Sequence, residues 1–299
     1  MDAKVPGTLH VDVFQMQFVD IAEVDLDKLQ ALSIAVRWPH RADDWQYLRE
    51  IGRGLVGLDE IGRAIGSVMW FPHGERFATI GMLITAPRLQ ANGTARWLTE
   101  RVLAECRGRK VRLNATREAR RLYASLGFVQ QKTVFQFQGE AVAPSEGEGL
   151  SAGLSLRRLG AGDLDAVMAL DTPAFGASRT AHIRQLFDSS DCYGLFEGKR
   201  LRAYSMSRRF GRGHVIGPVV ALDETDAITV VRPHVRALAG NFVRLDTHFE
   251  ASVLANFIQQ CGMSVFDTVT TMTLGEDADY GTGEGGQPVV FALASQSMG

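Results

Sequence analysis

Hydrophobic and polar positions in the first half of the chain alternate between two spacings. Residues 26–36 carry apolar side chains at helical spacing, with Asp25 placed as an N-cap. Other segments alternate with period two or form short apolar runs, which is typical of strands. The pattern predicts strands at 11–18, 54–58, 64–71, 77–85, 111–114 and 129–137, and helices at 26–36, 43–51, 94–105 and 117–125. This order indicates a mixed α/β sheet with helices on both faces.

The second half follows the same order of elements. It predicts strands at 154–158, 192–196, 202–208, 214–221, 242–245, 265–274 and a last one at 288–294, and helices at 164–170, 179–187, 227–239 and 252–261. The helix at 227–239 is predicted to be broken, because Pro233 lies inside it. Residues 139–153 are rich in Gly, Ser, Ala and Glu and show no apolar period, which indicates a linker. We therefore expect an N-terminal domain at 1–138 and a C-terminal domain at 154–299.

Three short sequence matches indicate that the halves are diverged copies. Residues 25–32 recur at 163–170, Ile80-Gly81 recurs as Ile216-Gly217, and 126–129 has a weaker echo at 261–264. The offsets are 138, 136 and 135, so the matches keep their order at nearly one spacing. The alternative is that amphipathic helices with acidic N-termini simply look alike.

Composition narrows the class of protein. The 299 residues are 45% hydrophobic and 22% charged, with a formal net charge of −2, so a generic nucleic-acid binder is not expected. Cys106, Cys192 and Cys261 are isolated and indicate reduced thiols. No metal-binding spacing, apolar signal core or membrane-length apolar run is present in the sequence. We expect a cytoplasmic protein with no metal cofactor and no membrane partner.

The most informative segment is 84–95, in which an apolar strand runs through a loop into an amphipathic helix. Free backbone N–H groups and the helix dipole make such a junction favourable for an anion. Gly93 would let the main chain approach a diphosphate without a Cβ clash. The alternative is an ordinary turn before a helix.

A second segment, 113–128, combines a strand end, Thr116 as an N-cap, a basic helix and a Gly127-Phe128 exit that suits a left-handed C-terminal residue. Tyr123 near its end could be a core aromatic. Together the segments resemble the GNAT superfamily of N-acetyltransferases. The resemblance rests on Pro87-Arg-Leu-Gln90-Ala-Asn-Gly93-Thr-Ala95 and Leu122-Tyr123-Ala-Ser-Leu-Gly127-Phe128. The run Leu113-Asn-Ala-Thr116 resembles the variant found in tandem-domain bacterial members, which implies two acyl-CoA N-acyltransferase-like domains.

The resemblance also implies roles for individual residues. Backbone amides of the loop would hold the CoA diphosphate, namely those of Gln90, Ala91, Asn92, Gly93, Thr94 and Ala95. The backbone of Leu83, Ile84 and Thr85 would pair with the pantetheine arm as an added strand would. Thr116 stands where most single-domain members carry an Asn that contacts pantetheine. Tyr123 would protonate the departing CoA thiolate.

The loop between the first two helices is the acceptor side in this family. Its dense aromatic and basic side chains would suit a small substrate with a carboxylate or a flat apolar part. These candidates are Trp38, His40, Arg41 and Trp45. The alternative is a hydrophobic anchor that ties the loop to the sheet. His73 and Glu75 are candidate bases, with solvated turn residues as the alternative.

The second half lacks both chemical requirements. Asp223, Glu224 and Asp226 stand where the diphosphate would lie, and Ile258 stands where the first copy has Tyr123. Neighbouring like charges repel by roughly 1 kcal/mol even in water. This predicts a degenerate copy. It would either cap the acceptor cleft or act as a scaffold or dimer surface, and the candidates for reaching into the cleft are Arg208, Arg209, Arg212, Asp246 and His248.

The sequence thus predicts an N-acetyltransferase that moves an acetyl group from acetyl-CoA to the amine of a small, amino-acid-like metabolite. A non-catalytic acyl-CoA-binding sensor or interaction protein on the same fold is the alternative. Acetylation of a protein lysine is a third hypothesis. A homodimer stays open.

Overall fold

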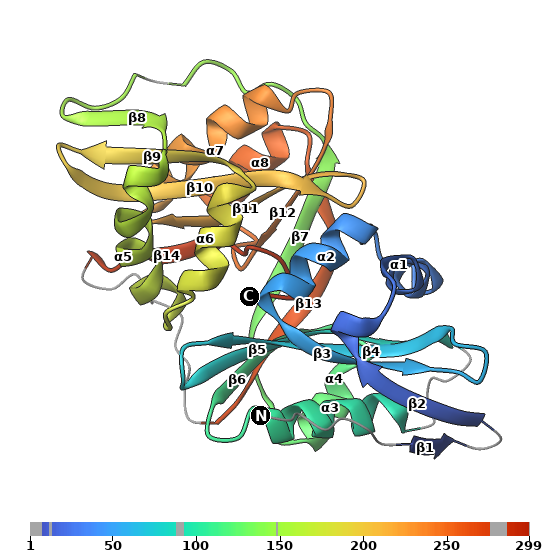
Figure 1. Ribbon diagram of the computed structural model, residues 1–299. Coiled ribbons are helices and arrows are strands. Elements are labelled where there is room, and N and C mark those ends of the chain that lie inside the picture. The colour runs from blue at the N-terminus through green and yellow to red at the C-terminus, as the bar shows by residue number, and fades with distance from the viewer. Residues whose placement is uncertain (1–7, 12–13, 88–92, 148, 276–285, 299) are drawn as a thin grey trace. The chain divides into compact units, whose positions relative to one another are not determined.

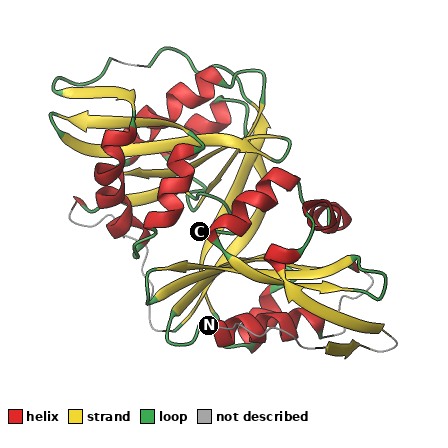
Figure 2. Ribbon diagram, viewed as in Figure 1, coloured by secondary structure: helices red, strands yellow, loops and turns green. Residues whose placement is uncertain are grey.

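A computed structural model describes residues 8–11, 14–87, 93–147, 149–275 and 286–298. The chain divides into two compact units, Met1–Val111 and Arg112–Gly299. Strands and helices follow one another through both units (Figure 1, Figure 2). The division falls inside a strand, so it follows packing and not the linker. The domain boundaries expected at 138 and 154 stay a prediction.

Unit 1 is an antiparallel sheet with helices on both sides (Figure 1). The strands lie in sequence order: β1 (Thr8–Val11), β2 (Phe14–Asp20), β3 (Arg53–Leu58), β4 (Ala64–His73) and β5 (Phe77–Thr85). After a short 3-10 turn at Ile21–Glu23, helices α1 (Leu26–Ala35) and α2 (Ala42–Ile51) lie on one side of the sheet, and α3 (Thr94–Glu105) lies on the other. Trp97 of α3 stacks on Phe18 of β2 with ring centroids 4.0 Å apart, which fixes α3 against the sheet.

Unit 2 contains a larger mixed sheet. Its order is β13 (Ser264–Leu274), β7 (Val129–Glu140), β12 (Phe242–Thr247), β11 (Gly213–Ala221), β10 (Arg200–Phe210), β9 (Asp191–Glu197) and β8 (Leu154–Arg158). Strand β6 (Lys110–Ala115), which contains the unit boundary, neighbours β13, and β14 (Val289–Ala292) pairs with β11.

The helices of unit 2 cover both faces of this sheet. They are α4 (Arg120–Ser125), α5 (Leu164–Phe175), α6 (Thr180–Asp188), α7 (Glu224–Ala237) and α8 (Val253–Gln260), with a 3-10 turn at Ala161–Asp163. Helices α5 and α6 lie in front of the sheet in Figure 1, and α7 and α8 lie behind it. Val230 and Val231 of α7 and Leu254 and Ile258 of α8 are fully buried in one core cluster. Each such side chain contributes about 1.5–3 kcal/mol by its removal from water.

Strand β7 joins a sheet that its sequence position does not predict. It directly follows the elements of the first copy, yet it pairs antiparallel with both β12 and β13. Phe137 lies opposite Leu245 on one side and opposite Val265 on the other, and it is fully buried. This pairing explains why the segment from Arg112 packs with the second unit.

The structure repeats one order of elements in the two copies. Strands β5 and β11 have the same length and the same bounds at an offset of 136, and β7 and β13 begin at an offset of 135. The connections after β5 and β11 differ. Residues 86–93 separate β5 from α3, whereas only Leu222 and Asp223 separate β11 from α7.

Several boundaries differ from the predicted ones. The segment predicted as one strand at 11–18 is two strands, β1 and β2, with residues 12 and 13 outside the described residues. Helix α5 continues through Pro173, and α7 begins at Glu224 and continues through Pro233. A proline inside a helix removes one backbone hydrogen bond. The buried apolar face of α7 offsets that loss, so the predicted break at Pro233 is wrong.

Candidate cofactor site and the second copy

Helix α3 begins at a glycine in a left-handed conformation. Gly93 is its N-cap, with φ 79° and ψ −8°, and no side-chain cap hydrogen bond is present there within the described part of the chain. A Cβ added at Gly93 would meet no atom of the described residues within 4 Å, so the positive φ, and not crowding by those residues, favours glycine here. Amides of the first helical turn have no intrahelical partner. Uncapped, they form a donor-rich, positive end of the helix dipole.

The residue after Gly93 is buried with an unsatisfied hydroxyl. Thr94 is 1% exposed, and its Oγ1 has no hydrogen-bond partner among the residues that the structure describes. Thr99, one turn further along the same helix, is equally buried but donates its hydroxyl to the Ala95 carbonyl at 2.7 Å. The two threonines therefore form a matched pair for mutation. Gln90, Ala91 and Asn92, the middle of the predicted cradle, lie outside the described residues.

Strand β5 carries a β-bulge just before the residues predicted to pair with pantetheine. Ser67 lies opposite Ile84 and Met69 lies opposite Gly81, so β5 has one extra residue between these pairs. Met82 takes φ 51°, which is unusual for a residue with a side chain, and the Ser67 hydroxyl donates to its carbonyl at 2.7 Å. Bulges redirect a strand. Leu83 lies within the bulge and is half-buried, and beyond it Ile84 is buried and Thr85 is half-buried.

Tyr123 lies in α4, inside unit 2. It is 5% exposed and packs edge-on against Phe128 with ring centroids 5.6 Å apart. Burial raises the pKa of the Tyr123 phenol above its ordinary value, so the phenol keeps its proton at neutral pH. Gly127 follows α4 with φ 89°, as its sequence position predicts.

Thr116 does not cap α4. The helix begins at Arg120, and Thr116 lies just before the turn that precedes it. The carbonyl of Thr116 accepts hydrogen bonds from the amides of Ala119 and Arg120. The predicted helix start at 117 is therefore three residues early. A threonine before a helix often caps it through its hydroxyl. Here the backbone carbonyl of Thr116, and not its hydroxyl, accepts from the amides of Ala119 and Arg120.

The predicted acceptor loop is held largely by its own contacts. Trp45 is fully buried and donates its indole N–H to the Ser33 hydroxyl at 2.8 Å. Arg41 forms a two-pronged ion pair with Asp44, at 2.9 Å and 3.1 Å. His40 is 8% exposed, and its ring centroid lies 6.3 Å from that of Trp45. These contacts suit an anchor.

Of the four predicted acceptor residues, Trp38 and Arg41 are half-buried, and the Trp38 ring lies 5.8 Å from that of His40. The two candidate bases have different environments. Glu75 is exposed, as expected for a turn. His73 is 2% exposed and shares a hydrogen bond of 3.0 Å with the Thr79 hydroxyl, so the alternative of a solvated turn residue is wrong for His73.

Helix α7, the counterpart of α3, begins with a side-chain cap from the protein itself. The Asp223 carboxylate accepts from the Asp226 amide at 2.8 Å. Glu224 accepts from the Leu254 amide at 2.8 Å, and Asp226 pairs with Arg202 at 2.9 Å. The three carboxylates therefore cap α7, join α8 and form an ion pair. The protein's own carboxylates thus lie at the start of α7, where a bound anion would otherwise lie.

The polar residues predicted to reach into an acceptor cleft have varied surroundings in unit 2. Arg208 donates to the Ala294 carbonyl at 3.2 Å, and Asp246 is fully buried against Arg244 at 2.8 Å. The His248 Nδ1 lies 3.0 Å from the Thr133 carbonyl, and burial lowers the pKa of His248 to about 4. Arg209 and Arg212 are exposed.

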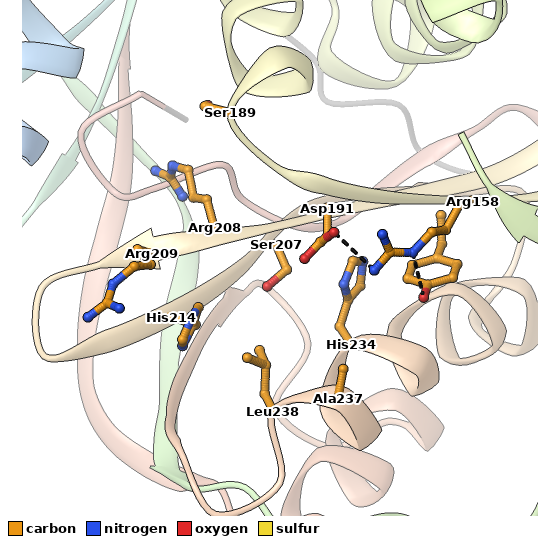
Figure 3. Close-up of a pocket in the computed structure, with 11 residues that line it drawn as sticks. Arg158, Ser189, Asp191, Ser207, Arg208, Arg209, His214, His234, Ala237 and Leu238 are labelled. Atoms are coloured by element: carbon orange, nitrogen blue, oxygen red, sulfur yellow. Dashed lines mark hydrogen bonds and ion pairs between the residues drawn. The ribbon is translucent and has the colours of Figure 1, made fainter. Parts of the chain in front are cut away.

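The sequence did not predict a small polar cavity of about 200 Å³ in unit 2 (Figure 3). Arg158 and Asp191 form an ion pair of 3.1 Å at its wall, and His234 lies beneath them on α7. Burial lowers the pKa of His234 to about 4, and Ser205 shares a 2.9 Å hydrogen bond with its Nε2. The lining residues come from four strands and a helix, so no local sequence motif marks them.

The described residues contain no cluster of three or more His, Cys, Asp and Glu side chains arranged to hold a metal ion. Among the described helices, none has both the length and the apolar character needed to cross a bilayer.

Comparison with known proteins identifies the family. Two models, each described as an acetyltransferase (GNAT) domain, match residues 41–145 and 167–281. The chain therefore belongs to the GNAT acetyltransferases. Within that family it has the tandem architecture, with two GNAT domains in one chain. No curated protein matches its sequence.

Solved structures share this fold at low sequence identity. A candidate acetyltransferase of Pyrococcus horikoshii has a TM-score of 0.74 at 16% identity, with 100% of both chains covered. A tandem GNAT protein from the clavulanic acid biosynthesis pathway has a TM-score of 0.63 at 14% identity, covering 88% of this chain and 99% of that one. A GCN5-related N-acetyltransferase of Sphaerobacter thermophilus has a TM-score of 0.59 at 14% identity, covering 86% and 95%. These likenesses concern the fold.

Proposed function

We propose that this protein transfers an acetyl group from acetyl-CoA to the amine of a small, amino-acid-like metabolite, and that the first copy binds the cofactor. One observation carries the proposal: α3, the next helix after the bulged strand β5, begins at a left-handed glycine with no side-chain cap among the described residues. The equivalent start of α7 is capped by Asp223, so the two copies differ at the point where a diphosphate would bind.

In this proposal the amides from Gln90 to Ala95 hold the diphosphate, and the backbone of Leu83–Thr85 pairs with the pantetheine arm. Thr116 is proposed to contact the same arm. Tyr123 acts as the general acid for the CoA thiolate, a role supported by the raised pKa that keeps its phenol protonated. No metal takes part in the proposed chemistry.

Acceptor recognition is proposed for Trp38 and His40, with Arg41 and Trp45 holding the loop around them. The second copy, with its satisfied carboxylates and Ile258 buried in place of a tyrosine, is proposed to be degenerate. We further propose a cytoplasmic location. It is supported by the unpaired, buried thiols of Cys106, Cys192 and Cys261.

The test is release of free CoA thiol from acetyl-CoA across a panel of amino acids, polyamines and aminoglycosides. Turnover with at least one of these amines is expected, and calorimetry should show one CoA bound per chain. A chain that binds no CoA overturns the proposal.

A non-catalytic acyl-CoA sensor is the second candidate, and the burial of Tyr123 against Phe128 favours it, since a buried tyrosine can be purely structural. CoA binding without turnover on any amine of the panel would support the sensor.

A further inference from the structure

The last strand of the chain occupies a particular stretch of the second copy. Strand β14 pairs antiparallel with β11 through residues Val219, Val220 and Ala221, opposite Ala292, Val290 and Val289. At the offset of 136 that relates β5 to β11, residues 219–221 correspond to Leu83–Thr85. In the first copy that is the stretch proposed to pair with the pantetheine arm.

Strand β14 lies between β11 and β12, beyond the point where these two strands pair with each other. Strands β11 and β12 are paired in parallel at His214 with Val243 and at Val215 with Arg244. Further along β11, from Val219 onward, β14 and not β12 pairs with this side of the strand, while β10 pairs with the other side. Just past β14, the Leu293 amide donates to the Asp246 carbonyl of β12 at 2.8 Å. The segment is thus hydrogen-bonded to β11 on one side and to β12 on the other.

Polar contacts fix the residues beyond β14 in the same unit. Arg208 donates to the Ala294 carbonyl at 3.2 Å, and Asn114 donates to the Gln296 carbonyl at 2.9 Å. The Gln296 amide donates to Asp246 and to Gln136, each at 3.2 Å. Met298 is 1% exposed. The strand Val289–Ala292 and the turn that follows it are therefore both held by hydrogen bonds within unit 2.

Gly217 shows that β11 is shaped for this occupant. A Cβ added there would lie 1.9 Å from the Leu293 carbonyl oxygen, and the next nearest atoms also belong to Leu293 and Ala294. Real Cβ atoms essentially never approach another atom this closely. The three atoms nearest to a Cβ at Gly217 therefore all belong to the C-terminal segment. Gly217 corresponds to Gly81 in the first copy.

We propose that the groove of the second copy is a peptide-strand site, filled by residues 288–298 of the same chain in place of an acyl-CoA arm. Backbone pairing supplies the binding energy, as in β-strand addition. The comparison with a pantetheine arm rests on the proposed function of β5. The pairing of β14 with β11 does not depend on that proposal. With the groove filled and α7 capped by Asp223, the second copy has no place for a second CoA.

The experiment compares the full chain with a chain that ends at Gln287. Truncation is expected to lower the Tm of unit 2 by about 5 °C or more, because it uncovers Val219 and Val220, which are fully buried. A synthetic peptide of residues 288–299 should restore the Tm, and a scrambled peptide should not.

A glycine variant makes the test specific for this groove. Gly217→Ala should lower the Tm of the full chain and leave the Tm of the truncated chain unchanged, because its obstacle is gone. Gly162→Ala is the control, since a Cβ at Gly162 meets no atom within 4 Å. An unchanged Tm on truncation, or an equal effect of Gly217→Ala in both chains, overturns the proposal.

If the truncated chain does not fold, hydrogen exchange on the full chain decides the matter. The amides of residues 290–293 should exchange slowly and become faster in Gly217→Ala. Fast exchange of these amides in the unmodified chain would overturn the proposal. None of these measurements involves CoA, so a failure here is distinguishable from a failure of the proposed function.

Discussion

A single added charge at Gly93 tests whether the start of α3 holds a diphosphate. Gly93 and Gly108 have the same φ, 79°, and at either position an added Cβ meets no atom within 4 Å. Asn and Asp are nearly the same shape, and both tolerate the left-handed region better than most residues. Comparing Asp with Asn at each position therefore isolates the charge from the change in backbone strain.

The expected size of the effect follows from Coulomb's law. Two unit charges 4 Å apart interact by about 1 kcal/mol in water and about 4 kcal/mol near a protein surface. Gly93 is exposed, so a value near 2 kcal/mol is reasonable for a carboxylate beside the diphosphate. Gly93→Asp should therefore bind CoA about 30-fold more weakly than Gly93→Asn.

Calorimetric titration of CoA into the four variants is the assay. The Asp and Asn variants at Gly108, beyond the C-terminal end of α3, should bind CoA equally. The penalty at Gly93 should shrink as salt is raised, because exposed charges are screened. Equal CoA affinities for Gly93→Asp and Gly93→Asn would refute the reasoning.

Three further predictions follow from individual contacts. Tyr123→Phe should lower kcat by about 100-fold with little change in CoA affinity, and a full rate across a pH series would exclude the general-acid role. In chemical denaturation without ligand, Thr94→Val should raise the free energy of unfolding by about 1 kcal/mol, and Thr99→Val should lower it by about 1 kcal/mol. The reason is that, of these two hydroxyls, the structure shows a hydrogen bond for that of Thr99 alone. Equal losses of stability in the two variants would mean that both hydroxyls are hydrogen-bonded. The pKa of His234 is lowered to about 4 in the folded protein, so the unfolded chain binds more protons below pH 6.5, and His234 should lower the stability of unit 2 by on the order of 3 kcal/mol as the pH drops from 6.5 to 4. The pKa of His248 is lowered to about 4 as well, so in denaturation at several pH values His234→Gln should reduce the slope of stability against pH without abolishing it, and an unchanged slope would exclude a contribution from His234.

Much of the fold was predictable because local patterns decide it. The helix at 94–105 and the strands at 77–85 and 154–158 match the predicted bounds, since each has a clear apolar period between turn residues. The repeat offsets predicted a duplication, and the resemblance of residues 87–95 and 122–128 predicted the GNAT family, which the two matching domain models confirm. Helix α7 was predicted to break because Pro233 is a local signal, whereas the burial that keeps the helix whole is tertiary.

Other features depend on partners far apart in the sequence. Nothing in residues 129–137 shows that their strand pairs with β12 and β13, which are more than a hundred residues away. Similarly, 288–294 was predicted as a strand, but its partner on β11 is visible only in the fold. For the candidate site, the sequence pointed to Gly93 but not to the buried, unsatisfied hydroxyl of Thr94 or to the internal pairing of Arg41.

A crystal structure of the CoA complex tests the central claim most directly. The account predicts the CoA diphosphate within hydrogen-bond distance of the backbone amides that begin α3, from Gly93 to Ala95, with one CoA per chain. A diphosphate found beside Asp223 at the start of α7, or a pantetheine arm lying on β11 in place of β14, would contradict it.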